Sequence, residues 1–170
     1  MNRQHEVKKV SVQVETKDFS FSDLSDYIYT ETYEIQKEIN LYNLQDVCIL
    51  AIARGGLTLA HSLAHKLCIK DIFTTSIKSY DDKQKRELDV SNFVLPNSLS
   101  RYKIILVVDD INDSGDTLNF VVSELNKIVC TNTKVYTVAL FEKAHSKHKL
   151  RFCPNRNVEN NIWINFFWEF

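Results

Sequence analysis

The sequence predicts an α/β fold in which helices flank a parallel sheet. Short runs of β-branched and other apolar residues alternate with amphipathic segments of about a dozen residues, and this order favours parallel strands joined by right-handed crossovers. The chain contains only three glycines, and each follows a predicted strand. With 170 residues, of which 44% are apolar, the chain can bury the core of one domain.

The first part of the chain is predicted to contain an exposed strand and a helix. Polar and apolar residues alternate over residues 7–17, which indicates a short strand or arm at the surface. Ser22 is in place to cap a helix that begins near Asp23. The apolar side chains of this helix recur on one face: Leu24, Ile28, Ile35 and Ile39.

The middle of the chain is predicted to continue with two strands around a helix. Val47–Ala53 is a continuous apolar run that is typical of a buried strand. Residues 57–67 have leucines at helical spacing, and residues 71–80 form the next strand candidate. The charged segment 81–89 is predicted to be a mobile loop.

A third strand and helix complete the predicted sheet. Ile104–Val108 has five apolar residues in a row, residues 117–129 have the pattern of a helix, and residues 134–143 form another strand candidate. The last twenty residues break this alternation and are expected to form a separate flap. We therefore expect one domain over the whole chain, with a core at about 22–145 and a C-terminal hood at about 146–170.

Composition argues against several classes of protein. The net charge is −1 and the isoelectric point is about 6.5, so neither a nucleic-acid partner nor an anionic membrane surface is expected. The four cysteines show no C-x-x-C spacing, which is typical of reduced thiols in a cytoplasmic protein. The N-terminus has no apolar signal region, and no run of 18 apolar residues occurs. We expect a cytoplasmic protein without a membrane span.

The three glycines indicate a binding site. Gly55 and Gly56 lie in "ARGGL", and Gly115 lies in "NDSGDT". Ligands of open α/β sheets bind at the carboxyl ends of the strands, and glycine there permits unusual backbone angles and close approach of a ligand. Two such loops in a chain with so little glycine predict a site between them.

The acidic segment "VVDDINDSGDT" narrows the chemistry of that site. It is not a Walker A loop, because no lysine follows Gly115, and it is not an EF-hand, because Val121 stands at position 12. It also lacks the glycines of a dinucleotide fingerprint. Backbone N–H groups that open a helix suit a phosphate, whereas Asp109 and Asp110 suit sugar hydroxyls and Mg²⁺. The segment therefore predicts a site for a phosphorylated sugar with a metal ion.

These motifs resemble those of the type I phosphoribosyltransferases. "VVDDINDSGDT" resembles the family's phosphoribosyl pyrophosphate motif, and "AIARGGL" is similar to its pyrophosphate-binding loop. "SYDDKQKREL" resembles the flexible catalytic loop. "LFEK" and "WINFFWE" are similar to the purine pocket of the bacterial xanthine-guanine enzymes. The resemblance covers about Val47 to the C-terminus in the family's order, and four motifs in sequence are more specific than any one.

The resemblance implies a role for each residue that binds the sugar phosphate. Asp109 and Asp110 would bind the ribose hydroxyls and Mg²⁺, and Arg54 and Gly55 would hold the pyrophosphate after a cis Ala53–Arg54 peptide. The residues around the 5′-phosphate would be Ser114, Gly115, Asp116 and Thr117. Two residues depart from the family's pattern: Asp116 stands where a neutral or basic residue is frequent, and Ala53 replaces a serine.

The resemblance also implies the residues that act on the base. Asp113 would take the purine N7 proton, and Lys143 would bond the 6-oxo group. Trp163 would stack on the base with Ile164 beside it. Three residues, of which Arg86 would be catalytic, fall in the loop that closes over the reacting groups: Tyr80, Arg86 and Glu87.

The function that follows from the resemblance is purine salvage. The expected enzyme transfers a phosphoribosyl group from 5-phosphoribosyl 1-pyrophosphate to guanine, xanthine or hypoxanthine, requires Mg²⁺, and forms a homodimer or homotetramer. Two alternatives stay open: a regulator of the same fold that senses phosphoribosyl pyrophosphate, or a transferase for another base. The arm before Ser22 is too short for a winged helix. No metal motif includes the histidine pairs, so we interpret them as surface or internally paired side chains: His61 and His65, His145 and His148.

Overall fold

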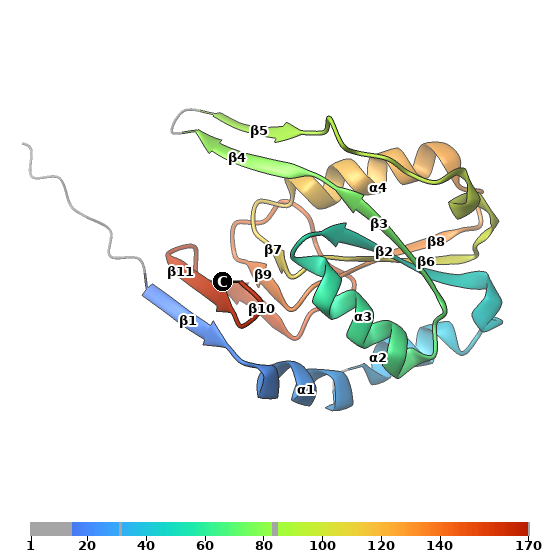
Figure 1. The fold of residues 1–170 in the computed structure, drawn as a ribbon, viewed down its shortest axis with the longest axis horizontal. Helices are drawn as coiled ribbons and strands as arrows, with labels where there is room; N and C mark the ends of the chain where they lie inside the picture. The colour runs from blue at the N-terminus through green and yellow to red at the C-terminus, as the bar shows by residue number, and fades with distance from the viewer. Residues whose placement is uncertain (1–14, 31, 83–84, 170) are drawn as a thin grey trace, which may run out of the picture.

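A four-stranded parallel sheet with the order β3-β2-β6-β8 lies at the centre of the structure (Figure 1). The computed structural model describes residues 15–30, 32–82 and 85–169. The four strands are β2 (Val47–Ala53), β3 (Asp71–Ser76), β6 (Ile104–Val108) and β8 (Lys134–Val138). Strands β2 and β6 have the predicted bounds, and both are buried over nearly their whole length.

Helices cover both faces of this sheet. Side chains alternate across a strand, so Ile49 and Ala51 pack in the core beneath α3 (Gly56–Leu67), whereas Leu50 and Ile52 pack in the core beneath α4 (Asp116–Ile128). The predicted fold class is therefore confirmed. The helices within the described ranges are all too short or too polar to cross a membrane.

The N-terminal helix is two helices, α1 (Phe21–Thr30) and α2 (Tyr33–Ile39), and not the single helix that was predicted. Its cap is Ser20 and not Ser22. The Ser20 Oγ accepts from the Asp23 N–H at 3.2 Å, and the Asp23 carboxylate accepts from the Ser20 N–H at 2.7 Å, which is a reciprocal capping pair. The helix is interrupted where the Thr32 hydroxyl donates to the Ile28 carbonyl at 2.8 Å, a bond of the kind that competes with helix continuation.

The segment after β3 is a hairpin of two strands, where a loop was predicted. Strands β4 (Lys78–Asp82) and β5 (Lys85–Asp89) pair antiparallel, from Lys78 opposite Asp89 to Asp82 opposite Lys85. The hairpin extends away from the sheet (Figure 1). The loop assignment was wrong because backbone pairing does not require apolar side chains, so a charged composition gives no indication of strands.

The predicted strand 134–143 is divided between two sheets. After β8 ends at Val138, the Leu140 N–H donates to the Asp110 carbonyl at 3.0 Å. The chain thereby leaves the central sheet and enters a smaller parallel one of order β10-β9-β7. Its strands are β7 (Ile111–Asn112), β9 (Phe141–Lys143) and β10 (Asn155–Val158).

The two terminal segments meet to form the hood. Strand β1 (Glu15–Phe19) pairs in parallel with β11 (Ile162–Phe166), and Figure 1 shows the pair beside the smaller sheet. Phe166 and Trp168 stack with ring centroids 4.7 Å apart, and Phe19 contacts both rings edge-on. The last strand thus lies beside the N-terminal strand, and the predicted bounds of the core and the hood stay a prediction. Residues 7–14 of the predicted arm lie outside the described residues.

Candidate active site

The loops that follow β2 and β6 touch at Gly55 and Asp110. A Cβ atom on Gly55 would lie 2.1 Å from the Asp110 Oδ2, and one on Gly56 would lie 2.3 Å from the Val108 carbonyl oxygen. Both distances are far below van der Waals contact, so neither position has room for a side chain. The two glycines thereby allow the predicted pyrophosphate loop to lie directly against the acidic segment.

The two acids of this segment are held in place by backbone groups. Asp110 is only 6% exposed, and its Oδ1 accepts from the Ile111 N–H at 2.7 Å. The Asp109 Oδ1 accepts from the Asp110 N–H at 3.0 Å. Burial is the main cause that raises the pKa of Asp109 well above its usual range and the pKa of Asp110 to about 6. The negative charge of Glu169 raises the pKa of Asp110 further.

This pair of carboxyl groups fits Mg²⁺. Desolvated and mutually repelling carboxylates are stabilised by a cation, and Mg²⁺ characteristically takes one or two carboxylates while it keeps waters and phosphate oxygens. Within the described ranges, no group of three or more acidic, histidine or cysteine side chains converges as a closed metal cage. Asp109 and Asp110 are therefore suited to an ion that is shared with a phosphorylated substrate.

The predicted phosphate loop turns sharply into α4. Gly115 has a φ of +87°, and the Ser114 Oγ accepts from the Asp116 N–H at 3.2 Å. The first backbone N–H groups of a helix favour an anion. The Asp116 carboxylate pairs with the Lys147 ammonium at 3.4 Å, so much of the added negative charge is compensated outside the loop.

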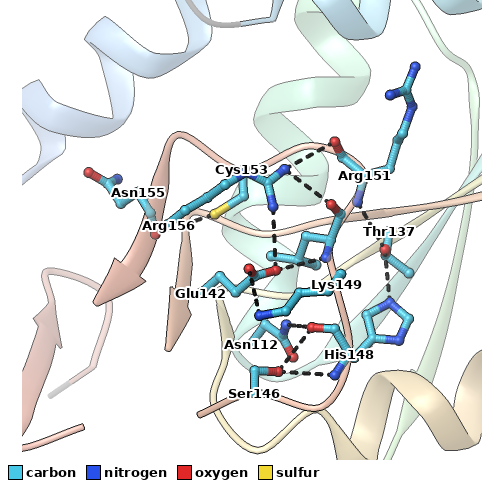
Figure 2. Close-up of polar contacts among 11 residues, drawn as sticks. Asn112, Thr137, Glu142, Ser146, His148, Lys149, Arg151, Cys153, Asn155 and Arg156 are labelled. Atoms are coloured by element: carbon cyan, nitrogen blue, oxygen red, sulfur yellow. Dashed lines mark hydrogen bonds and ion pairs between the residues drawn. The ribbon is translucent and has the colours of Figure 1, made fainter. Parts of the chain in front are cut away.

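The segment from Ser146 to His148 lies against this loop, and Figure 2 shows its contacts with Asn112 and Thr137. A Cβ atom on Gly115 would lie 2.5 Å from the His148 backbone nitrogen, so glycine is required by space as well as by φ. The Asn112 side-chain amide donates to the His148 carbonyl at 2.7 Å, and the His148 ring bonds Thr137 at 3.0 Å. His148 is thus a paired side chain, as interpreted, and burial lowers its pKa.

A buried acid that the sequence analysis missed anchors the same segment. Glu142 is 2% exposed, and its carboxylate accepts from the Leu150 N–H at 2.8 Å. Lys149 and Arg156 each approach the carboxylate at 3.5 Å, as Figure 2 shows. A buried carboxylate needs such partners, but they lie 7 to 14 residues away in the chain. No local pattern identifies them.

A cavity of about 1200 Å³ opens over the two glycine loops. The predicted residues that line it are Arg54, Gly55, Asp109, Asp110 and Thr117, and Lys78 and Glu169 are lining residues that the sequence analysis missed. The Ala53–Arg54 peptide is cis, as the resemblance implied. The cavity is thus lined by two cations, Arg54 after β2 and Lys78 in β4, and by three acids, Asp109, Asp110 and Glu169.

A second cavity of about 710 Å³ lies beneath the hood. Asp113, Lys143, Trp163 and Ile164 all line it, and Asp110 borders both cavities. Trp163 is 62% exposed, which leaves its ring accessible, whereas Ile164 is 4% exposed and packs into the core. The structure therefore brings together the four residues that the resemblance assigned to the base.

Lys143 has structural partners in this cavity. It is 5% exposed, and its Nζ donates to the Glu159 carbonyl at 3.0 Å and to the Ile162 carbonyl. Burial lowers its pKa, whereas the nearby Asp113 raises it. Lys143 thus holds the turn between β10 and β11, and this turn leads directly into the strand that carries Trp163.

The predicted closing loop corresponds to the β4–β5 hairpin. Its backbone places Tyr80 opposite Glu87 and Asp81 opposite Arg86. The side chains of Tyr80, Arg86 and Glu87 lie outside the part of the structure that is described. Their predicted roles therefore stay predictions.

Known proteins resemble the chain in sequence and in structure. The profile of the phosphoribosyl transferase domain matches residues 27–170. A xanthine-guanine phosphoribosyltransferase of Ruegeria sp. (strain TM1040) is 37% identical over 126 residues, which cover 71% of this chain and 67% of that protein. One of the same name from Cereibacter sphaeroides is 28% identical over 124 residues, 71% of this chain and 68% of that protein.

Solved structures show the same fold. The purine phosphoribosyltransferase of Pyrococcus horikoshii superposes with a TM-score of 0.72 at 22% identity, over 91% of this chain and 95% of that one. The xanthine-guanine-hypoxanthine phosphoribosyltransferase of Helicobacter pylori gives 0.69 at 22% identity, over 91% and 93%. With these likenesses and the two glycine loops beside a pair of buried acids, the chain belongs to the phosphoribosyltransferase family.

Proposed function

We propose that the chain is a purine-salvage enzyme that transfers the phosphoribosyl group of 5-phosphoribosyl 1-pyrophosphate to N9 of guanine, xanthine or hypoxanthine. The observation that carries this proposal is the arrangement of the two cavities. One lies over the glycine loops and the other lies under Trp163, and Asp110 borders both. A sugar phosphate in the first cavity would present its C1′ to a base in the second.

The buried acids would serve the sugar and the metal. Asp109 and Asp110 would hold Mg²⁺ together with the ribose hydroxyls, and the ion would neutralise charge on the leaving pyrophosphate. Departure of pyrophosphate develops positive charge on the ribose, which nearby carboxylates stabilise. Arg54 would hold the pyrophosphate oxygens through charge-assisted hydrogen bonds. The 5′-phosphate would lie at the start of α4, from Ser114 to Thr117.

The base would be bound and activated from the second cavity. Trp163 would stack on the purine ring, and Lys143 would donate to the 6-oxygen. Asp113 would accept the N7 proton, for which it needs only to lie within hydrogen-bond reach. Closure of the β4–β5 hairpin, with Tyr80 and Arg86, would exclude water as a competing nucleophile.

A homodimer or homotetramer in the cytoplasm completes the proposal. The N-terminal helices carry three large and mostly exposed aromatic side chains: Phe21 at 69%, Tyr29 at 73% and Tyr33 at 67%. Exposed apolar groups of this kind are frequent at protein interfaces. Light scattering after gel filtration would test this assembly, and a monomer at micromolar concentration would refute it.

A panel of bases tests the activity. With phosphoribosyl pyrophosphate and Mg²⁺, guanine, xanthine or hypoxanthine should release pyrophosphate, and excess EDTA should abolish the release. Adenine presents an amino group to Lys143, so the hydrogen of that ammonium that faces the base finds no acceptor, which should lower kcat/KM by about 10-fold or more. Binding of phosphoribosyl pyrophosphate without turnover of any base would favour a regulator, and preference for adenine or a pyrimidine would favour a transferase for another base.

A further inference from the structure

His145 links two elements of the base cavity that are distant in the sequence. It lies two residues after Lys143, at the end of β9. Its Nε2 is 3.4 Å from the Asp113 Oδ1, and its Nδ1 is 2.5 Å from the Asn160 Oδ1. All three residues line the cavity. The imidazole therefore spans from the loop before α4 to the turn between β10 and β11.

The hydrogen on this ring can be assigned from its neighbours. The Asp113 carboxylate only accepts hydrogen bonds, so Nε2 must carry a hydrogen to bond it. Asn160 can present either its oxygen or its amide nitrogen to Nδ1, because the two ends of an amide are interchangeable in assignment. With the amide nitrogen facing Nδ1, a neutral ring carries its hydrogen on Nε2, toward Asp113. With the oxygen facing Nδ1, the ring bonds both neighbours only when both of its nitrogens carry hydrogen.

The position of Asn160 is in turn fixed by the hood. Lys143 bonds the carbonyl groups of Glu159 and Ile162 on either side of it. Asp113 is only partly buried, with 45% of its side chain exposed, so the loop backbone alone does not enclose the carboxyl group. The His145 ring, which Asn160 contacts from the other side, supplies a contact from outside this loop.

We infer that His145 is a positioning residue that orients Asp113 for acceptance of the purine N7 proton. This inference rests on the proposed function, in which Asp113 is the base. A ring that donates from Nε2 selects one rotation of the carboxyl group and ties it to the turn that precedes Trp163. The distance of 3.4 Å is long for a hydrogen bond, and catalytic contacts of this kind tighten when substrate binds.

His145→Ala tests the inference in the full-length protein. The variant should lower kcat by about 10-fold, the scale of a small misplacement of a reacting group, while KM for phosphoribosyl pyrophosphate stays within about 2-fold. His145→Gln restores an N–H donor of similar reach and should recover part of kcat. His61→Ala, at an exposed position on α3, is the matched control and should behave as the parent. An unchanged kcat in His145→Ala would overturn the inference.

A double-mutant cycle separates this role from the proposed function. Asp113→Asn should lower kcat by ~10²-fold or more, and His145→Ala added to it should have no further effect, because the two residues act as a unit. A further 10-fold loss in the double variant would show that His145 acts independently and would overturn the inference alone. Full activity of Asp113→Asn would refute Asp113 as the base and the positioning role with it.

A measurement without turnover gives an independent readout. Nitrogen chemical shifts of the His145 ring in the unliganded protein should show a hydrogen on Nε2. The Nε2 resonance should move in Asp113→Asn and stay in place in the control Asp116→Asn. A neutral ring with its hydrogen on Nδ1 alone would overturn the inference.

Discussion

The two cavities differ in how the chain builds them. The cavity over the glycine loops is lined by Arg54 and Gly55 and by Asp109, Asp110 and Thr117, which follow the paired strands β2 and β6, and also by Lys78 of β4 and by Glu169. The cavity under the hood takes Lys143 from β9, Trp163 from β11 and Asp113 from the loop before α4. The centre of the first cavity is thus formed by two loops that follow paired strands, whereas the second takes Asp113, Lys143 and Trp163 from three different elements. Substitutions in the first should act mainly on binding, and substitutions in the second should also disturb the relative position of the elements.

The largest effect is expected from Asp110→Asn in the first cavity. Loss of the carboxylate should weaken phosphoribosyl pyrophosphate binding in Mg²⁺ by ~10²-fold or more, because the metal loses a charged ligand. Calorimetric titration would measure this loss. Asp26→Asn, at an exposed position on α1, is the control and should bind normally. Tight, Mg²⁺-dependent binding by Asp110→Asn would contradict the assignment of the metal site.

The same variant should alter the pH dependence of stability. Folding raises the pKa of Asp110 from 3.8 to about 6, so the folded state binds the proton more tightly than the unfolded state does. The free energy of unfolding of the unliganded protein should therefore fall as the pH rises through that interval. Asp110→Asn removes this penalty and should raise the Tm at pH 7 by a few degrees. A Tm below that of the parent would show that the carboxylate stabilises the fold.

A smaller effect with a different signature is expected from Lys143→Ala in the second cavity. The variant should lower kcat/KM for oxopurines by ~10²-fold, the scale of a lost charge-assisted hydrogen bond, and should lower it less for adenine. It should also loosen the β10–β11 turn, because the Glu159 and Ile162 carbonyls lose their bonds to the Lys143 ammonium. Kinetics with guanine, xanthine, hypoxanthine and adenine would show whether the difference in kcat/KM between oxopurines and adenine becomes smaller. Lys127→Ala, on the exposed face of α4, is the control, and an unaltered oxopurine preference would contradict the pocket assignment.

Trp163→Ala should have a still smaller and more uniform effect. Ring stacking does not distinguish purines, so every base should lose ~10-fold in affinity while the ranking stays the same. The Trp163 side chain is 62% exposed, so the Tm should change little. Equilibrium binding of each nucleotide product would provide the comparison. A change in ranking would mean that Trp163 reads a substituent of the base.

The smallest effect is expected from Asp116→Asn. The carboxylate pairs with Lys147 at the surface, and exposed ion pairs contribute at most about 1 kcal/mol. KM for phosphoribosyl pyrophosphate should change by less than about 2-fold. Steady-state kinetics at two salt concentrations would test this expectation. A tenfold fall in KM would show that the acid repels the substrate phosphate.

Much of the central sheet and of the first cavity could be predicted from the sequence. The strands Val47–Ala53 and Ile104–Val108 are buried on both faces, so their continuous apolar runs are unambiguous. Asp109, Asp110 and the Gly115 loop lie in one short stretch of the chain, and their residue types and spacing indicated a phosphorylated sugar. The close approach of Gly55 to Asp110 follows once the two strands are neighbours in a parallel sheet.

The second cavity was decided by the tertiary structure. The switch of the chain into the smaller sheet after Val138 depends on a bond to the Asp110 carbonyl. No local residue pattern predicts this switch. Glu142 meets its cations across loops, and His145 meets Asp113 because β9 pairs with β7, the strand that Asp113 follows. Periodicity and turn chemistry describe near neighbours in the chain, whereas such contacts form between segments whose separation in space is set by the packing of the whole fold.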